Sequence, residues 1–405
     1  MSAHLIGRRT LAAALSATAF SRTARAQSAP IRIAVLNDQS SVYSASGGVG
    51  TVAAVRLAAE DMGYKAGPFQ VEVRGYDHQN KTDIGAAIAA RAYDEQGIDA
   101  IFDIGNSAIS LAVQDIARQR GKMLVHVGSA HDSLYGKACS PVGAQWVYDT
   151  YSLAKGLTKA IFDQGGTSWF FITADYAFGT AMQGEATKVL TALGGKVVGS
   201  VRHPVGTSDF SSYLLQAQAS GANTVALANA AGDTVNAAKQ AFEFGIGTGK
   251  QKLATLIFYL NSVHELGTQA KGIQYLESFY WDRDDASRNF GKRFAELRGA
   301  GTMPTHTQAG NYSAALHYLK AVATTGSRDG LTVMRQMKAT PVNDAFAHNA
   351  VLRADGRLMK DYFLAEAKAP STPGGWDVLT LKATIPANEV IRPLAEGGCT
   401  FLDPA

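Results

Sequence analysis

The fold is decided by residues 31–76, which hold the strand-like run IRIAVLN (31–37), the helical pattern VGTVAAVRLAAEDM (49–62) and the strand-like run FQVEVRGY (69–76). The two outer runs are rich in apolar and β-branched residues, whereas the apolar residues of the middle segment recur every three or four positions. A strand, a helix and a second strand in this order are typical of a right-handed crossover in a parallel sheet. The stretch therefore predicts an α/β fold.

The same alternation continues along the chain in two series. The first series adds expected strands at Ala100–Gly105 and Met123–Gly128. The second series is expected to place strands, with helices between them, at Ser168–Thr173, Lys196–Val201, Thr224–Asn229 and Leu253–Tyr259. Because the two series match in layout, the alternation predicts two α/β units, each with a mainly parallel sheet.

No low-complexity linker separates the two series, so we expect short crossovers at a hinge, near residues 147–150, 277–281 and 343–350. Such a hinge allows two lobes to close around a ligand. This assignment gives residues 31–147 and 280–343 to an N-terminal lobe, residues 148–279 and 344–390 to a C-terminal lobe, and residues 391–405 to a C-terminal tail.

The last part of the chain departs from the alternation. Asp355-Gly356 is a strong turn signal. It lies between the strand-like runs Ala350–Arg353 and Asp361–Ala367, so it predicts a hairpin formed by these two runs.

Residues 1–26 have the order of a secretory signal peptide. They contain Arg8-Arg9, an apolar stretch from Leu11 to Phe20, and the small-x-small cleavage motif Ala24-Arg25-Ala26. The apolar stretch is too short to span a bilayer as a helix, so we expect export to the periplasm and no membrane insertion after processing. The twin arginine is compatible with the general secretory route and with the Tat route.

The net positive charge of the chain comes from this leader. The 405 residues include 38 Lys and Arg against 34 Asp and Glu, which gives a formal net charge of +4. Residues 1–26 hold four of the arginines and no acidic residue, so the processed chain is neutral overall. Because nucleic-acid binding needs clustered positive charge, we expect no nucleic-acid partner.

The chain contains two cysteines, Cys139 and Cys399. In an oxidising compartment two such cysteines most often pair. A disulfide between them would pin the C-terminal tail to a loop of the first lobe. The alternative is two free, buried thiols.

Motifs of catalysis and cofactor binding are weak. Residues 48–53 (GVGTVA) fit a G-x-G-x-x-A pattern, but ten residues separate them from the preceding strand, whereas a dinucleotide site needs the first glycine directly after the strand. His264-Glu265 lacks the second histidine of a zinc-protease motif, since Thr268 stands in its place, and the nine histidines show no metal-ligand spacing. We therefore expect no catalytic residue, no metal and no cofactor.

Candidate ligand-binding residues lie where the predicted strands end. In open parallel sheets, ligands lie beyond the carboxyl ends of the strands, where helix N-termini offer unpaired N–H groups. Hydroxyls, amides, small residues and aromatic rings gather at these ends, as a mostly apolar ligand with one polar or anionic head requires. The candidates are Tyr43, Asn106, Ser107, Ser129, Ala130, Asp175, Tyr176, Phe178, Asn229, Asp233 and Asn261.

These candidates divide by chemistry. Asn106, Ser107 and Ser129, with nearby backbone N–H groups, suit a carboxylate, whereas the aromatic candidates suit an apolar or aromatic body. Each polar candidate also has an ordinary structural interpretation, because Ser, Asn and Asp are common helix N-caps. For Asp233 in particular, the alternative is that it serves only as the N-cap of its helix, and for Phe178 the alternative is a place in the core.

Several short motifs occur in an order that carries a family resemblance. After the signal peptide come IRIAVL (31–36), RLAAED (56–61), VEV (71–73), DYAFG (175–179) and DFSSY (209–213). In this order the chain resembles the type I periplasmic solute-binding proteins, in particular the leucine/isoleucine/valine-binding branch that serves ATP-driven uptake. The resemblance covers essentially the whole chain beyond the leader.

The resemblance implies two Rossmann-like lobes, a three-crossover hinge, ligand capture by hinge closure and handover to the membrane permease of an ABC transporter. In amino-acid binders of this branch, hydroxyl and backbone groups of the first lobe hold the ligand carboxylate. The loops that hold these groups contain Asn106, Ser107, Ser129 and Ala130 in this chain, and Tyr43 matches an aromatic residue that covers the ligand.

One position departs from the family pattern. Amino-acid binders place an acidic side chain in the second lobe to pair with the ligand ammonium, but the matching strand end of this chain reads Tyr259-Leu260-Asn261. An unpaired, buried ammonium would be costly, although Asp175 or Asp233 could substitute. We therefore expect a small carboxylate ligand, with an aromatic acid first and a branched-chain amino acid second.

Two further hypotheses come from other functional classes. The same fold could serve as a ligand-sensing subunit of a signalling receptor. An exported enzyme would need a nucleophile–base pair or a metal site, and the sequence shows neither. The leading hypothesis is a non-enzymatic, periplasmic binding protein.

Overall fold

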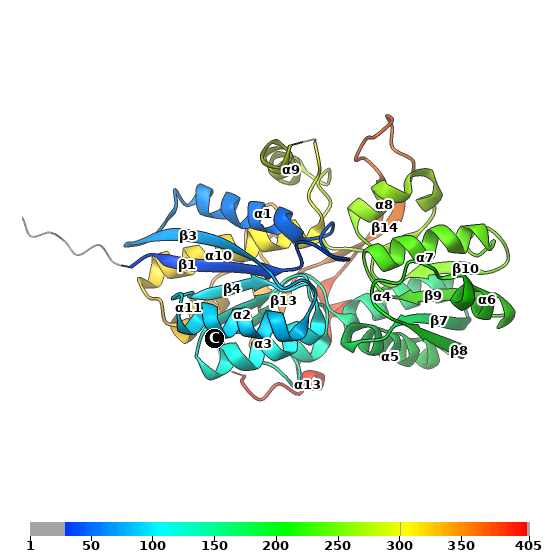
Figure 1. Cartoon of the computed structure of the whole chain (residues 1–405), viewed down its shortest axis with the longest axis horizontal. Coiled ribbons are helices and arrows are strands. Elements are labelled where there is room, and N and C mark those ends of the chain that lie inside the picture. The colour runs from blue at the N-terminus through cyan, green and yellow to red at the C-terminus, as the bar shows by residue number, and fades with distance from the viewer. Residues whose placement is uncertain (1–28, 300, 403–405) are drawn as a thin grey trace, which may run out of the picture.

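The structure is a computed structural model that describes residues 29–299 and 301–402. The predicted signal peptide, residues 1–26, lies outside the described residues. Two α/β lobes lie side by side, and the chain crosses between them near the middle of the molecule (Figure 1). The predicted α/β class and the parallel sheets are confirmed.

The first lobe is built on a six-stranded sheet in the order β2-β3-β1-β4-β5-β6. Its central strand, β1 (Ile31–Asn37), pairs in parallel with β3 and β4 and is almost entirely apolar because helices bury both of its faces. The other strands are β2 (Lys65–Ala66), β3 (Phe69–Asp77), β4 (Ala100–Asp103), β5 (Met123–His126) and β6 (Gly143–Gln145). The helices of this lobe are α1 (Gly48–Asp61), α2 (Thr82–Asp94), α3 (Ser107–Gln119), α9 (Asp285–Arg298), α10 (His306–Thr325) and α11 (Gly330–Ala339).

The second lobe holds a four-stranded parallel sheet in the order β10-β9-β7-β8 and a three-stranded antiparallel sheet in the order β11-β14-β15. The parallel strands are β7 (Ser168–Ala174), β8 (Lys196–His203), β9 (Thr224–Ala228) and β10 (Lys252–Thr255). The helices are α4 (Thr150–Asp163), α5 (Ala177–Ala192), α6 (Ser211–Ala219), α7 (Gly232–Glu243) and α8 (Leu260–Leu266). The antiparallel strands are β11 (Gln274–Glu277), β14 (Tyr362–Ala367) and β15 (Leu379–Ile385).

The hairpin at Asp355-Gly356 differs from the prediction. The turn joins β12 (Val351–Leu352) to β13 (Leu358–Met359), and the expected partner run is instead β14, which pairs with β11 and β15. The short hairpin stays with the first lobe because the Gln145 N–H donates to the Gly356 carbonyl at 2.8 Å and β12 contacts α11. The strand partner predicted for this hairpin was wrong. A turn signal marks where the chain reverses direction, but not how far the strand after the turn extends.

This placement also affects the lobe boundary. Residues 351–359 were expected in the C-terminal lobe, but they pack with β6 and α11 of the first lobe. The last crossing of the chain therefore lies near Lys360, where β13 gives way to β14. β11 ends at Glu277, and the chain leaves the second lobe directly afterwards.

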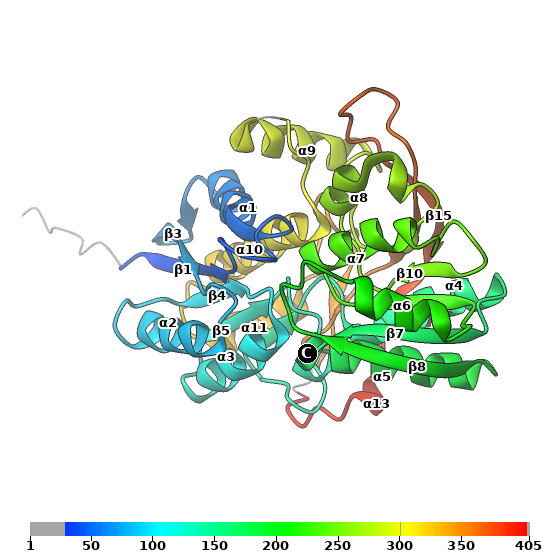
Figure 2. The same ribbon diagram turned by 45° about the vertical axis from the view of Figure 1, so that its right-hand side comes forward.

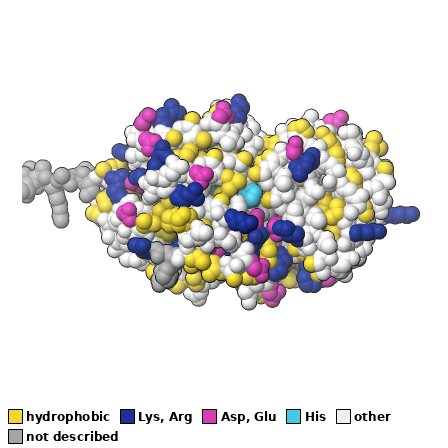
Figure 3. Space-filling model, turned by 90° about the horizontal axis from the view of Figure 1, so that it is seen from below, with side chains coloured by type: hydrophobic (Ala, Val, Ile, Leu, Met, Phe, Trp, Pro, Cys, Tyr) yellow, Lys and Arg dark blue, Asp and Glu magenta, His cyan; other side chains and the backbone are white. Residues whose placement is uncertain are grey.

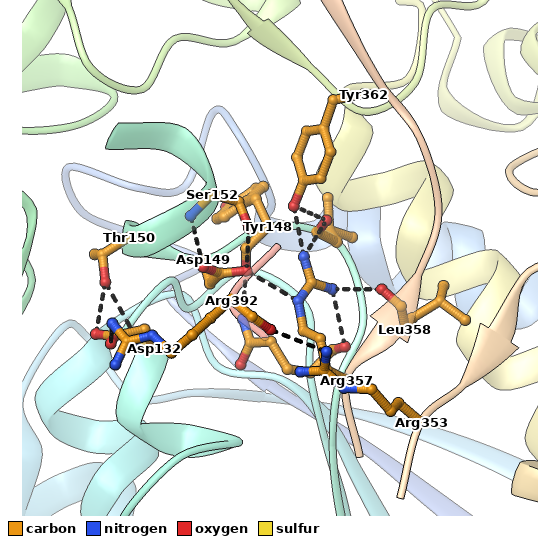
Figure 4. Close-up of polar contacts among 12 residues, drawn as sticks. Asp132, Tyr148, Asp149, Thr150, Ser152, Arg353, Arg357, Leu358, Tyr362 and Arg392 are labelled. Atoms are coloured by element: carbon orange, nitrogen blue, oxygen red, sulfur yellow. Dashed lines mark hydrogen bonds and ion pairs between the residues drawn. The ribbon is translucent and has the colours of Figure 1, made fainter. Parts of the chain in front are cut away.

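A buried ion pair ties the first and last crossings together. The Arg357 Nε lies 2.9 Å from the Asp149 Oδ2, and both side chains are 0% exposed. The second carboxylate oxygen, Asp149 Oδ1, accepts from the N–H of Ser152 and so caps α4. The Arg357 guanidinium also donates to the Leu358 carbonyl, and the Tyr362 hydroxyl donates to the Val147 carbonyl at 3.1 Å (Figure 4).

The C-terminal segment runs along both lobes. It contains the short helices α12 (Ala387–Val390) and α13 (Leu394–Gly397), and α13 lies at the boundary between the lobes in both ribbon views (Figures 1 and 2). Cys139 and Cys399 form a disulfide that ties this segment to the first lobe. Arg392 pairs with Asp132 of the first lobe and, at 3.3 Å, with Glu185 on α5 of the second lobe.

Buried histidines make the fold sensitive to acid. Burial lowers the pKa of His78 from 6.5 to about 4 and the pKa of His126 from 6.5 to about 3. Below pH 6.5 the unfolded chain therefore binds protons that the folded chain does not. We expect the free energy of unfolding to fall as the pH is lowered from 7 to 4, by at most about 1.4 kcal/mol per pH unit for each histidine.

Urea unfolding of wild type and His126→Gln between pH 4 and pH 7 measures this dependence. The variant should show a shallower loss of stability, because one of the buried histidines with a lowered pKa is gone. His348→Gln is the matched control, since the His348 side chain is 61% exposed. Equal slopes for His126→Gln and wild type would contradict the prediction.

Candidate ligand-binding site

A cavity lies between the two lobes, at the carboxyl ends of their parallel strands. Residues from both lobes line a space of about 460 Å³, which includes solvent at its mouth. The charge of the outer surface differs from that of the cavity wall. Seen from below, Lys and Arg side chains are interspersed with Asp and Glu over the surface of the molecule (Figure 3). The wall of the cavity, in contrast, contains no Lys, Arg or His among the residues that the structure describes.

Tyrosine hydroxyls meet across the cavity. The Tyr43 hydroxyl of the first lobe lies 2.7 Å from the Tyr176 hydroxyl of the second lobe. The Tyr148 hydroxyl donates to the Gly128 carbonyl at 2.9 Å and lies 3.2 Å from the Tyr259 hydroxyl. Burial raises the pKa of all four tyrosines, so they stay neutral and can still donate and accept hydrogen bonds.

The first lobe presents hydroxyl and backbone groups at the start of α3. Ser107 is the first residue of this helix and lines the cavity, as does Ala130 in the loop after β5. The Ser129 Oγ donates to the Ser107 Oγ at 3.4 Å and lies behind it. Because a helix N-terminus carries unpaired N–H groups and a positive dipole end, this corner of the cavity is suited to an anion.

Asn106 has a structural task at the same corner. Its Oδ1 accepts from the N–H groups of Ala108 and Ile109, and its Nδ2 donates to the Asn80 Oδ1. The side chain is therefore the N-cap of α3. It does not line the cavity.

The aromatic candidates of the second lobe line the cavity, and its polar candidates do not. Tyr176 and Phe178 begin α5 and face the cavity with their rings 5.9 Å apart. The carboxylate of Asp175, between them and β7, is instead 63% exposed and pairs with Arg202.

The other three polar candidates are engaged within the second lobe or turned away from the cavity. Asn229 contacts His203 and accepts from the Thr234 hydroxyl. Both carboxylate oxygens of Asp233 accept from the Gly206 N–H, and burial raises the pKa of Asp233 to about 6. Neither these residues nor Asn261 lines the cavity.

The structure thus brings five of the predicted residues to one cavity and places Ser129 directly behind them. The five are Tyr43, Ser107, Ala130, Tyr176 and Phe178. The sequence analysis did not select Asp103, Tyr148, Tyr259 or Thr307, which also line the cavity. Tyr259 could have been selected, because it lies at the end of a predicted strand. Tyr148 reaches the cavity from a crossover and Thr307 from the start of α10, and no local sequence pattern marks such positions as cavity-lining.

Two other features bear on the kind of site. In the described residues, 29–299 and 301–402, no helix is both long and apolar enough to cross a bilayer. The same part of the chain contains no group of three or more His, Cys, Asp or Glu side chains placed to hold a metal ion.

Comparisons with known proteins all point to the same family. A family model described as periplasmic binding protein matches residues 30–373. A crystal structure of a periplasmic binding protein from Burkholderia mallei is 41% identical, with a TM-score of 0.88, and the match covers 92% of this chain and 99% of that one. A branched chain amino acid ABC transporter periplasmic ligand-binding protein from Burkholderia xenovorans is 40% identical, with a TM-score of 0.81, covering 92% and 100% of the two chains.

More distant relatives share the fold. A solute-binding protein of an ABC transporter from R. palustris, solved in complex with benzoate, is 17% identical with a TM-score of 0.81, and the match covers 92% of this chain and 99% of that one. The curated Leu/Ile/Val-binding protein homolog 6 of Brucella abortus is 24% identical over 139 residues, so the match spans about a third, 35%, of that relative's length. Together with the two-lobed fold and its central cavity, these matches show that the chain belongs to the periplasmic binding protein family, with the type I fold of the Leu/Ile/Val-binding proteins.

Proposed function

We propose that this protein is the non-enzymatic, periplasmic substrate-binding component of an ABC uptake system, and that it captures a small carboxylate between its lobes and delivers it to a membrane permease. The observation that carries the proposal is the cavity itself. One wall offers hydroxyl groups and the N-terminus of α3, and the opposite wall offers the aromatic rings of Tyr176 and Phe178. An anionic head and an apolar body fit these two walls.

An aromatic acid is the preferred ligand. Tyr43, Tyr176 and Phe178 provide flat apolar surface for a ring, and Ser107 and Ala130 lie where a carboxylate would sit. Support comes from relatives of the same fold that were solved with benzoate and with 4-hydroxybenzoate. A branched-chain amino acid is the second candidate, because the relative from Burkholderia xenovorans carries that name.

Hinge closure would couple binding to transport. The Tyr43–Tyr176 pair joins the two lobes across the cavity, and Tyr148 at a crossover pairs with Tyr259 of the second lobe. A ligand that contacts both walls favours the closed state, because it can make all of its contacts only there.

A screen of ligands with the purified protein tests the proposal. We expect benzoate or a hydroxybenzoate to raise the melting temperature, since a ligand at 100 times its Kd stabilises the folded state by about 2.7 kcal/mol. Ser107→Ala should weaken carboxylate binding about tenfold, because a hydrogen bond to a charged group contributes about 1.5–3 kcal/mol. Asp175→Asn, at an exposed carboxylate outside the cavity, is the matched control and should bind as wild type does.

Three outcomes would count against the proposal. A shift with leucine and none with aromatic acids would overturn the preferred ligand. Full affinity of Ser107→Ala would remove Ser107 from the site. Turnover of any bound acid by the purified protein would overturn the non-enzymatic role.

A further inference from the structure

Asp103 places a buried carboxylate in the wall of the cavity. It is the last residue of β4 and is 1% exposed. Asp103 and Ile104 both have left-handed backbone conformations, with φ of 81° and 53°, which non-glycine residues adopt rarely. The strand therefore ends at Asp103, two residues earlier than the sequence predicts. As a result, the Asp103 carboxylate lies on the cavity side of the sheet, beside β1.

One oxygen of this carboxylate is engaged and the other is not. The Oδ2 accepts from the Asn37 Nδ2 at 2.9 Å. The Oδ1 has no hydrogen-bond partner among the residues that the structure describes, and neither has the Oγ of Ser46, which lines the same part of the cavity. The backbone of Gly128 lies close to the Oδ1, since a Cβ built at Gly128 would be only 2.6 Å from it.

The other acid in the wall, Asp38, is fully used by its own loop. Its Oδ1 accepts from the N–H groups of Ser40 and Ser41, and its Oδ2 accepts from the Ser41 hydroxyl and the Tyr43 N–H. Among the described residues of the wall, Asp103 is thus the acidic residue with a carboxylate oxygen that accepts no hydrogen bond. The wall also contains no basic side chain that could pair with it. Burial raises the pKa of Asp103, and the hydrogen bonds around the carboxylate oppose that shift without cancelling it.

We propose that Asp103 selects the ligand by accepting a hydrogen bond from a donor group, a hydroxyl or an ammonium, carried by the bound carboxylate. The inference rests on the proposed function, because it places the ligand in the same cavity. The acceptor repels the ligand carboxylate and so directs it to the corner formed by Ser107 and Ala130. An acid that could pair with an ammonium is therefore available in the first lobe, although the wall formed by the second lobe offers none among the described residues.

Two pairs of compounds separate the possible donors. Benzoate and 4-hydroxybenzoate differ by a hydroxyl, and 4-methylpentanoate and leucine differ by an ammonium. In calorimetric titrations of the wild-type protein, we expect the donor-bearing member of at least one pair to bind at least tenfold more tightly. The pair that shows the preference identifies the donor.

Asp103→Asn is the informative variant. Its side-chain oxygen can still accept from Asn37, so that the amide NH₂ takes the place of the free Oδ1 and a donor faces the ligand donor. Asn also tolerates the left-handed backbone. We expect the preference to fall below threefold, while the affinity for the donor-free acid stays within threefold of wild type. Asp175→Asn should keep the full preference.

Gly128→Ala provides a second route to the same result, because its methyl group would lie 2.6 Å from the Asp103 Oδ1 and would also press on the Gly105 Cα at 3.0 Å. If Asp103→Asn does not fold, as judged by circular dichroism, the loss of preference in Gly128→Ala decides the question. Equal affinities within both pairs for the wild-type protein, or an unchanged preference in the folded variants, would overturn the role of Asp103 and leave the proposed function standing. A wild-type protein that binds none of the four compounds would overturn both.

Discussion

Arg357→Met is expected to lower the free energy of unfolding by about 3–5 kcal/mol, the usual cost of removing one partner of a buried ion pair. The Asp149 carboxylate would remain 0% exposed and would lose its charged partner. The N–H and the hydroxyl of Ser152, which donate to this carboxylate, offset only part of that loss. Denaturant unfolding followed by tryptophan fluorescence measures the change.

Arg202→Met is the matched control for this prediction. Arg202 pairs with Asp175 at 3.1 Å, but the two side chains are 46% and 63% exposed. Solvent screens such a pair, and it contributes about 0–1 kcal/mol. Equal losses of stability in the two variants would show that burial of the Arg357–Asp149 pair has no special weight.

Reduction of the Cys139–Cys399 disulfide is expected to cost about 3–5 kcal/mol of global stability. The two cysteines are 260 residues apart in sequence, so the bond restricts the unfolded chain strongly, and the entropic estimate for such a loop is about 5.6 kcal/mol, an upper value for the measured effect. The unfolding midpoint in guanidinium should therefore fall when a reductant is added. The folded state should keep its far-ultraviolet circular dichroism, because the disulfide only ties down the C-terminal segment.

The double variant Cys139→Ser/Cys399→Ser is the control. It should unfold at the midpoint of the reduced wild-type protein, and reductant should not shift that midpoint. Coinciding midpoints for oxidised and reduced wild type would contradict the prediction.

The parallel sheets could be predicted from the sequence because their central strands, such as β1, β4 and β9, are buried on both faces. β1 was predicted with its bounds, Ile31–Asn37, since a continuous apolar run there ends abruptly in polar residues. β4 proved shorter than expected because the left-handed turn at Asp103 and Ile104 ends it, and no glycine or proline announces that turn. Pairing of the late strands was mispredicted because it depends on contacts between distant segments, as for β11 and β14.

The site could be predicted only in part, for a related reason. Strand ends are visible in the sequence, and Tyr43, Ser107 and Tyr176 at such ends line the cavity. The sequence does not show which strand-end side chains are consumed by local hydrogen bonds, as Asn106 is by its cap. Nor does it show that the crossover residue Tyr148 is carried into the cavity by the packing of the lobes.

The anchored C-terminal segment has a practical consequence for observing motion. Cys399 is bonded to Cys139, and the Arg118 guanidinium of α3 lies 5.9 Å from the centre of the Phe401 ring, so Cys399 and Phe401 are fixed to the first lobe. β1, which starts at Ile31, belongs to the same lobe. A pair of fluorophores attached near Ile31 and Phe401 would therefore report almost nothing of a closure of the proposed hinge. A sensor built on this protein needs one label within the second lobe, for instance at the exposed end of β8.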